Sequence, residues 1–190
     1  MKKEIFLSFK PEFFRPILYG MKKYEYRKRF CKEEARAFLY LSSPVREVVG
    51  IVEFGAPVDI GGIMGAFSEK PDVYRRLEAC IRSGEKTAVP IISLQLYKSP
   101  IHISKIKAID PSFTVPRSYL NIRKYKSVYE YLDTQELFEP EFYNSHEAIY
   151  EDNIGMTCEE MERTDEFIKK DKIYTADSKY AMIKCGYISK

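Results

Sequence analysis

Two runs of Val and Ile, at residues 45–54 and 89–97, place the strongest constraint on the fold of this chain. Each run is long enough for a buried strand, and β-branched side chains fit a pleated, half-buried surface. Gly50 interrupts the first run, and we expect a bulge or bend there. Between the runs, residues 71–82 carry apolar side chains at helical spacing, which predicts a helix. The order of these elements indicates a mixed α+β domain.

The N-terminal region predicts a strand, a short helix and a second strand. Residues 5–9 alternate well enough for the first strand. Pro11 is tolerated in a first helical turn, and Gly20 is a suitable residue to end the helix. Between them runs an apolar stripe: Phe13, Phe14, Ile17 and Leu18. The second strand is expected at residues 24–29.

The remainder of the chain predicts shorter elements and loops. Residues 59–65 contain three glycines and predict a flexible loop, without the Lys-Ser/Thr pair of a phosphate-binding loop. A loop at Ser99-Pro100 precedes residues 101–106, whose alternation predicts a continuation of the sheet. An irregular region, two helices and a last strand follow, in this order: residues 110–126, 127–138, 157–170 and 180–188. The second of these helices opens with the capping box Thr157-Cys158-Glu159-Glu160.

The net charge of +3 conceals an uneven distribution along the chain. Residues 1–129 hold 24 Lys and Arg against 13 Asp and Glu, whereas residues 130–171 hold 3 against 14. A basic body with an acidic segment is typical of polyanion-binding proteins, although two solvated surfaces of opposite sign would give the same numbers. We therefore divide the chain into a domain at residues 1–129 and an acidic helical extension at residues 130–190. The extension is expected to pack on the same domain and to supply a closing strand.

Three roles stay open for the acidic extension. It would compete with nucleic acid if it lay over a basic cleft, or it would bind a protein partner. It would otherwise complete the core through its own apolar side chains and those just before it: Val128, Leu132, Phe138 and Phe167.

The cysteines and histidines do not form a metal-ligand cluster by spacing. The four cysteines are scattered, with no Cys-x-x-Cys pair: Cys31, Cys80, Cys158 and Cys185. Of the two histidines, His102 is expected to be structural and His146 to lie in a surface loop. Arg29 and Lys32 would lower the pKa of Cys31, yet no partner is positioned to use the thiol, so we expect an inert cysteine. These residues, and the lack of a signal peptide or an apolar run long enough to span a membrane, predict a cytoplasmic protein with reduced thiols and no metal or cofactor.

The most informative segment runs from Gly20 to Arg29. On a strand, Tyr24 and Tyr26 share one face, whereas the opposite face carries a carboxylate between two guanidinium groups: Glu25, Arg27 and Arg29. Such a row can hold a planar polar ligand, because Arg donates to a phosphate or a base edge and Glu accepts from an amine. A salt-bridged solvent face would use the same residues.

Gly20, Lys22, Glu25 and Arg27 stand in the order G-x-K-x-x-E-x-R, which resembles the signature of the ASCH family within the PUA-like superfamily. Further segments resemble the family in the expected order: Leu7-Ser8-Phe9-Lys10-Pro11-Glu12, Leu39-Tyr40-Leu41-Ser42-Ser43-Pro44, Val49-Gly50-Ile51-Val52-Glu53-Phe54 and Pro116-Arg117-Ser118-Tyr119. The resemblance covers residues 3–125.

The resemblance implies a small mixed β-barrel flanked by helices, with a cleft that binds RNA or a modified nucleobase. Carried over by position, Lys22, Glu25 and Arg27 would line this cleft. Neighbouring residues expected to add contacts are Ser8, Lys10, Arg29, Ser42, Ser43, Arg117 and Tyr119. Two basic runs near these positions, interleaved with tyrosines, would add phosphate contacts and stacking surfaces. The predicted partner is RNA or another single-stranded nucleic acid, or a nucleoside-like ligand.

Catalysis is the alternative to binding. One branch of the family removes acetyl groups from a modified cytidine, but it places a threonine nucleophile where Glu25 stands here. Glu25 beside Lys22 would instead act as a general base, and Ser42 or Ser43 would need a distant partner to act as a nucleophile. Ribonuclease-like cleavage by acid and base residues also stays open. We expect binding rather than catalysis and assign no catalytic residue.

Overall fold

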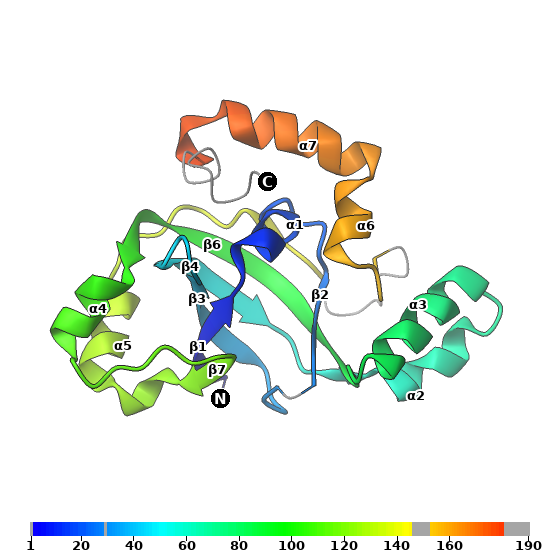
Figure 1. Cartoon of the computed structure of the whole chain (residues 1–190), viewed down its shortest axis with the longest axis horizontal. Coiled ribbons are helices and arrows are strands. Elements are labelled where there is room, and N and C mark those ends of the chain that lie inside the picture. The colour runs from blue at the N-terminus through cyan, green and yellow to red at the C-terminus, as the bar shows by residue number, and fades with distance from the viewer. Residues whose placement is uncertain (1, 29, 146–152, 181–190) are drawn as a thin grey trace.

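The computed structural model describes residues 2–28, 30–145 and 153–180 (Figure 1). Six strands follow the order β2-β6-β4-β3-β1-β7, and two short strands also pair with β6. Their bounds are β1 Lys3–Phe9, β2 Tyr24–Arg27, β3 Ala35–Leu41, β4 Glu47–Phe54, β5 Val58–Asp59, β6 Thr87–His102, β7 Tyr119–Asn121 and β8 Phe142–Tyr143. β1 and β3 are parallel, and the other pairings are antiparallel. The sheet curls into a half-barrel with helices around it, which confirms the expected α+β fold.

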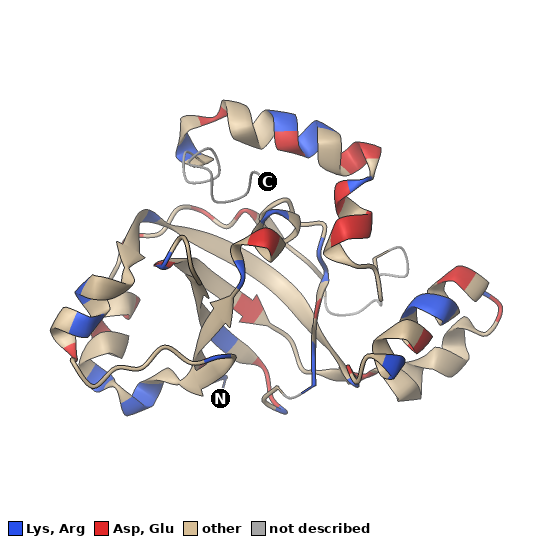
Figure 2. Ribbon diagram, in the orientation of Figure 1, with Lys and Arg blue, Asp and Glu red and all other residues tan. Residues whose placement is uncertain are grey.

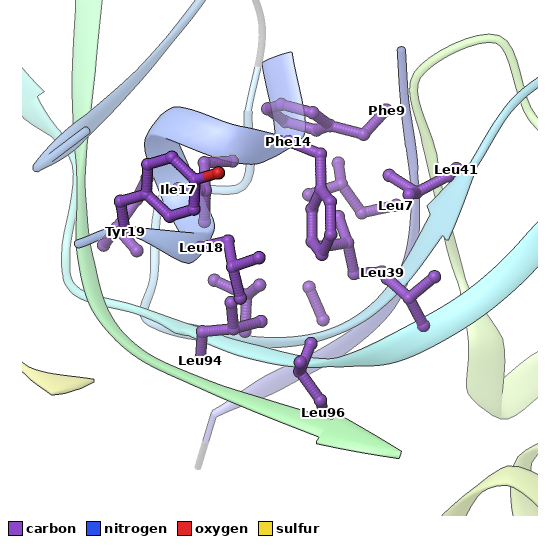
Figure 3. Packing of buried hydrophobic residues seen from close by; sticks show 14 of the residues in the cluster. Leu7, Phe9, Phe14, Ile17, Leu18, Tyr19, Leu39, Leu41, Leu94 and Leu96 are labelled. Atoms are coloured by element: carbon purple, nitrogen blue, oxygen red, sulfur yellow. The ribbon is translucent and has the colours of Figure 1, made fainter. Parts of the chain in front are cut away.

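The main core lies between the sheet and a short helix, α1 (Phe14–Leu18), which follows the 3-10 turn η1 (Pro11–Phe13). Figure 3 shows the side chains that pack together here, from the helix and from three strands: Leu7, Phe14, Ile17, Leu18, Leu39, Leu94 and Leu96. Gly20 follows with a φ of +66°, as its expected place after the helix requires.

The close approach of β4 to β6 requires Gly50. A Cβ at this position would lie 2.1 Å from the Gln95 carbonyl oxygen, and the strand register shifts beside it. The expected bulge is therefore confirmed. The same shift explains why the loop predicted at Ser99-Pro100 is wrong, since both residues belong to β6. Pro100 has no N–H to donate, and it falls in the bulged part of the strand.

A helix, α4 (Ile103–Ile109), replaces the strand expected over residues 101–106 beyond His102. His102 Nδ1 accepts a hydrogen bond from the Ser104 N–H at 3.2 Å and caps this helix, which is a structural role. Ile103 and Ile106 are both buried. A spacing of three residues suits one helical turn, so the short alternating segment did not distinguish a strand from a helix.

The helix predicted at residues 71–82 is confirmed as α3 (Pro71–Arg82), and Gly84 follows it with a φ of +87°. α3 and the short helix α2 (Ile60–Met64) form a lobe beside the lower end of β2 (Figure 1).

The flexible loop expected at residues 59–65 is wrong, because α2 (Ile60–Met64) and the 3-10 turn η2 (Gly65–Phe67) occupy it. The Asp59 carboxylate accepts a hydrogen bond from the Gly62 N–H at 2.7 Å and caps α2. An N-cap and buried apolar neighbours thus order a glycine-rich segment that propensity alone would leave irregular.

On the opposite side, η3 (Ile122–Lys124) and α5 (Lys126–Asp133) pack beside α4 (Figure 1). α5 is shorter than the helix predicted at residues 127–138. The chain after it becomes extended because the Phe138 N–H donates to the Leu96 carbonyl at 2.8 Å.

The extension contributes α6 (Cys158–Glu162), which opens with the expected capping box at Thr157. The single helix predicted from there is wrong, because a second helix, α7 (Asp165–Ala176), starts after a break. The Thr164 hydroxyl accepts from the Phe167 N–H at 3.2 Å and caps α7.

α7 lies over α1 (Figure 1), and Met161 and Phe167 belong to the main core. Tyr180 lies in the turn η4 (Ser178–Tyr180), and the rest of the strand predicted at residues 180–188 lies outside the described residues. Within the described ranges, no helix combines the length and apolar character needed to cross a bilayer.

Candidate functional site

The alternation predicted for β2 is observed. Tyr24 and Tyr26 belong to the core beneath α2 and α3, and the Tyr26 hydroxyl accepts a hydrogen bond from the Gly155 N–H. Glu25 and Arg27 point to the other side of the strand and meet each other there. Because one face of β2 is fixed by packing, the opposite face has a defined direction.

A surface cleft of about 510 Å³ opens on this face of β2. Five of its lining residues were predicted from the sequence: Ser8, Lys10, Glu25, Arg27 and Arg117. Six others were not assigned to the site: Phe9, Phe13, Tyr26, Lys28, Glu85 and Ser118. The cleft is therefore formed by five segments: the end of β1, the turn after it, β2, the turn after α3 and the segment before β7.

Lys22, Glu25 and Arg27 form an ion triad, of which Glu25 and Arg27 line the cleft. Glu25 is 6% exposed, and its Oε1 accepts from Arg27 Nε at 2.9 Å. Lys22 Nζ lies 3.1 Å from the other carboxylate oxygen, Oε2. Both oxygens of Glu25 are thus held by cations of the protein itself, and the carboxylate orients Arg27.

Lys22 lies behind Glu25 and is not among the residues that line the cleft. Its Nζ is also 3.7 Å from Cys158 Sγ on α6. Burial lowers the pKa of Lys22, but the interactions with Glu25 and Cys158 outweigh burial, and the pKa is raised. Lys22 therefore stays charged and balances the buried carboxylate.

Arg27 connects three segments of the chain. Its Nη1 donates to Ser118 Oγ at 2.8 Å, and its Nη2 donates to the Ser8 carbonyl at 3.3 Å, in addition to the bond to Glu25. A guanidinium carries five N–H donors, so two donors are not used by these bonds. The Ser8 hydroxyl in turn donates to the Pro116 carbonyl at 2.7 Å, which fixes the wall that holds Arg117.

Positive charge at the mouth of the cleft comes from Lys10, Lys28 and Arg117, which are exposed. Lys10 pairs with Glu12 at 3.3 Å, whereas Lys28 and Arg117 form no ion pair with any residue that the structure describes. Figure 2 shows basic residues along β2.

The acidic extension does not contribute to the cleft in the part of the chain that is described. The lining residues all lie between positions 8 and 118. The hypothesis that the extension covers the cleft is therefore wrong for residues 130–145 and 153–180. Many of their acidic residues lie on α6 and α7 (Figure 2).

Some predicted site residues lie outside the cleft. Ser42 and Ser43 form the turn after β3 and are not among its lining residues, although the Ser42 N–H donates to the Phe9 carbonyl at 2.8 Å. Tyr119 packs against Phe30, with ring centroids 5.4 Å apart, and does not line the cleft. Arg29 lies outside the described residues.

The thiols offer little reactivity at this site. Burial raises the pKa of Cys31, contrary to the lowering expected from its basic neighbours. Burial also raises the pKa of Cys158, and Lys22 offsets this only in part. Neither thiol is a prepared nucleophile.

No protein-family model matches the chain. The "ASCH domain-containing ribonuclease" of Zymomonas mobilis is 27% identical over 128 residues, which cover 65% of this chain and 86% of that protein. The crystal structure of ASCH from Zymomonas mobilis superposes with a TM-score of 0.53 at 24% identity, over 70% of this chain and 96% of that one. A serine-to-alanine variant of the same protein gives a TM-score of 0.53 at 25% identity, over 71% and 98%. The half-barrel thus matches the ASCH fold, and these relatives support the resemblance of the chain to the ASCH domain family.

Proposed function

We propose that the cleft binds single-stranded RNA. The observation that carries this proposal is the pairing of a fixed guanidinium, Arg27, with exposed cations at the same opening. Lys10, Lys28 and Arg117 supply charge for phosphate groups, and Arg27 has two further donors for a phosphate or a base edge.

The shape and the lining of the cleft favour an unpaired strand. Duplex RNA is recognised mainly by its backbone geometry across a wide groove, whereas unpaired bases can enter a pocket and stack on aromatic side chains. Phe13 is half-buried at the cleft and Phe9 lies beneath it, so an apolar surface stands beside the cations. The ribonuclease name of the Zymomonas relative adds support for RNA as the polymer.

Fluorescence anisotropy of the full-length chain with labelled single-stranded RNA, duplex RNA and single-stranded DNA tests this proposal. The expected result is tightest binding to single-stranded RNA and a clear loss in Lys10→Ala/Arg117→Ala. The matched control is Lys169→Ala/Lys172→Ala, which removes the same charge from exposed positions of α7. Equal losses of RNA affinity in both double variants would mean that binding depends on net charge alone, which would contradict a role for the cleft.

RNA cleavage is the second candidate function, and the observation in its favour is that the Zymomonas relative is named a ribonuclease. In the cleft, Glu25 is occupied by the ion triad, which argues against its use as a general base. A cleavage assay decides between the two functions. End-labelled RNA is incubated with the wild-type chain or with Lys10→Ala/Arg117→Ala, and the products are analysed on a gel. Cleavage by the wild type that the double variant loses would establish a ribonuclease, and intact RNA under saturating protein would leave a binding protein.

A further inference from the structure

The cleft contains a second carboxylate, Glu85, whose surroundings differ from those of Glu25. Glu25 is buried and ion-paired through both oxygens to Lys22 and Arg27. Glu85 is half-exposed, lines the same cleft, and forms no ion pair or side-chain hydrogen bond with any described residue. Of the two carboxylates, Glu85 is therefore the one with its acceptor oxygens available to a ligand.

The backbone places Glu85 at a defined position on the wall of the cleft. α3 ends in a hydrogen-bonded turn in which the Glu85 N–H donates to the Cys80 carbonyl at 2.9 Å, with Gly84 in the left-handed region. Two residues later β6 begins, and Thr87 pairs with Arg27. Glu85 thus lies just beyond the end of β2, whose last residue is Arg27 of the ion triad.

A carboxylate in this position has a specific use in a site for RNA. It is an acceptor, so it attracts an amine or another N–H on a base edge, and it repels phosphate groups. The cations of the cleft already serve phosphate, and Phe13 offers a surface for a base. An acidic group kept among these cations reduces affinity for a polyanion unless it contacts something other than phosphate.

We propose that Glu85 reads the base in the cleft and selects an amine-bearing base such as cytosine over uracil. This inference rests on the proposed binding of single-stranded RNA. Cytosine presents an N4 amine, whereas uracil presents the O4 oxygen at the same place, so the carboxylate accepts from the first and repels the second. The two bases have the same ring shape, which confines the difference to this edge.

Anisotropy titrations with oligocytidine and oligouridine of about twelve nucleotides test the proposal, a length within the range of single-strand sites. The wild type should bind oligocytidine about tenfold more tightly, the size of one good base contact. Glu85→Gln should weaken binding of oligocytidine and strengthen binding of oligouridine, because a glutamine amide can donate to O4. Glu69→Gln, at an exposed position outside the cleft, is the matched control for the loss of one negative charge.

A purely electrostatic role of Glu85 would give a different result for Glu85→Gln. If Glu85 only repels RNA, then Glu85→Gln will strengthen the binding of both oligonucleotides equally, and the proposal is overturned. Equal affinity of the wild type for both also overturns it while leaving the proposed function intact. An absence of binding to either oligonucleotide by the folded wild type removes the proposed function and this inference with it.

Discussion

Arg27 Nη1 lies 2.8 Å from Ser118 Oγ, and the two residues are 91 positions apart in the chain. This bond runs from β2 to the segment that precedes β7, so it joins two segments that line the cleft. Arg27 also reaches the Ser8 carbonyl, which belongs to β1. The signature arginine is thus part of the framework of the cleft as well as a candidate ligand contact.

Arg27→Ala should therefore reduce stability as well as RNA binding. The substitution removes three hydrogen bonds and leaves Glu25 buried with one cation fewer, for which a loss of about 3 kcal/mol is typical. Urea unfolding measures the change, with Arg117→Ala as the control because its side chain is exposed at the same cleft. The framework role is wrong if the two variants are equally stable.

The ion triad should behave as one unit. Lys22→Met leaves the buried Glu25 carboxylate with a single cation, and we expect it to cost about 3 kcal/mol. Glu25→Gln should cost less in this background than in the wild type, because the carboxylate has already lost one of its two cations and one buried cation fewer is left without its partner. A double-mutant cycle of unfolding free energies measures the coupling. Simple additivity of the two substitutions would show that the residues do not depend on each other.

The contribution of Lys22 to the free energy of unfolding should decrease at alkaline pH. Burial lowers the pKa of Lys22, but Glu25 and Cys158 raise it by more, so the folded pKa exceeds the unfolded one. A raised pKa gives stabilisation that is complete below the unfolded value of about 10.4 and is lost as the pH rises through the folded value. The difference in unfolding free energy between wild type and Lys22→Met should therefore stay constant up to about pH 9 and shrink above about pH 10.4. A difference that grows with pH in this range would contradict the assignment.

Cys80 should resist alkylation in the folded chain. Burial raises the pKa of its thiol to about 11, and only the thiolate reacts quickly. Peptide mapping after iodoacetamide treatment at about pH 8 should show slow labelling of Cys80 in native buffer and fast labelling in urea. Equal rates in the two conditions would mean that the thiol is accessible and ionised in the folded protein.

Local patterns predicted much of the fold. The stripe of α1, the capping box at Thr157 and the bulge at Gly50 depend on residues close in sequence, and all three were confirmed. Errors arose where long-range contacts decide the structure. Pro100 remains in a strand because β6 bulges opposite β4, and the glycine-rich α2 is ordered by a cap and by packing.

In the candidate site, too, local patterns were predicted correctly and long-range contacts were not. Alternation on β2 correctly separated the two tyrosines from Glu25 and Arg27. It could not indicate that both oxygens of Glu25 would be used internally, because that depends on where Lys22 lies. Ser118 and Glu85 were missed for a related reason, since they reach the cleft from segments about 90 and 60 residues away from β2. One signal pointed to Ser118, because it follows Arg117 in the segment at residues 116–119 that resembles the ASCH family.

The salt dependence of RNA binding tests the central claim most directly. Each phosphate contact on a single strand contributes about 0.7 to the slope of log affinity against log salt. If the cleft holds the strand through Lys10 and Arg117, the slope of Lys10→Ala/Arg117→Ala should be smaller than that of the wild type by about 1.4, while Lys169→Ala/Lys172→Ala keeps the wild-type slope. The same slope in all three proteins would contradict the cleft as the RNA site.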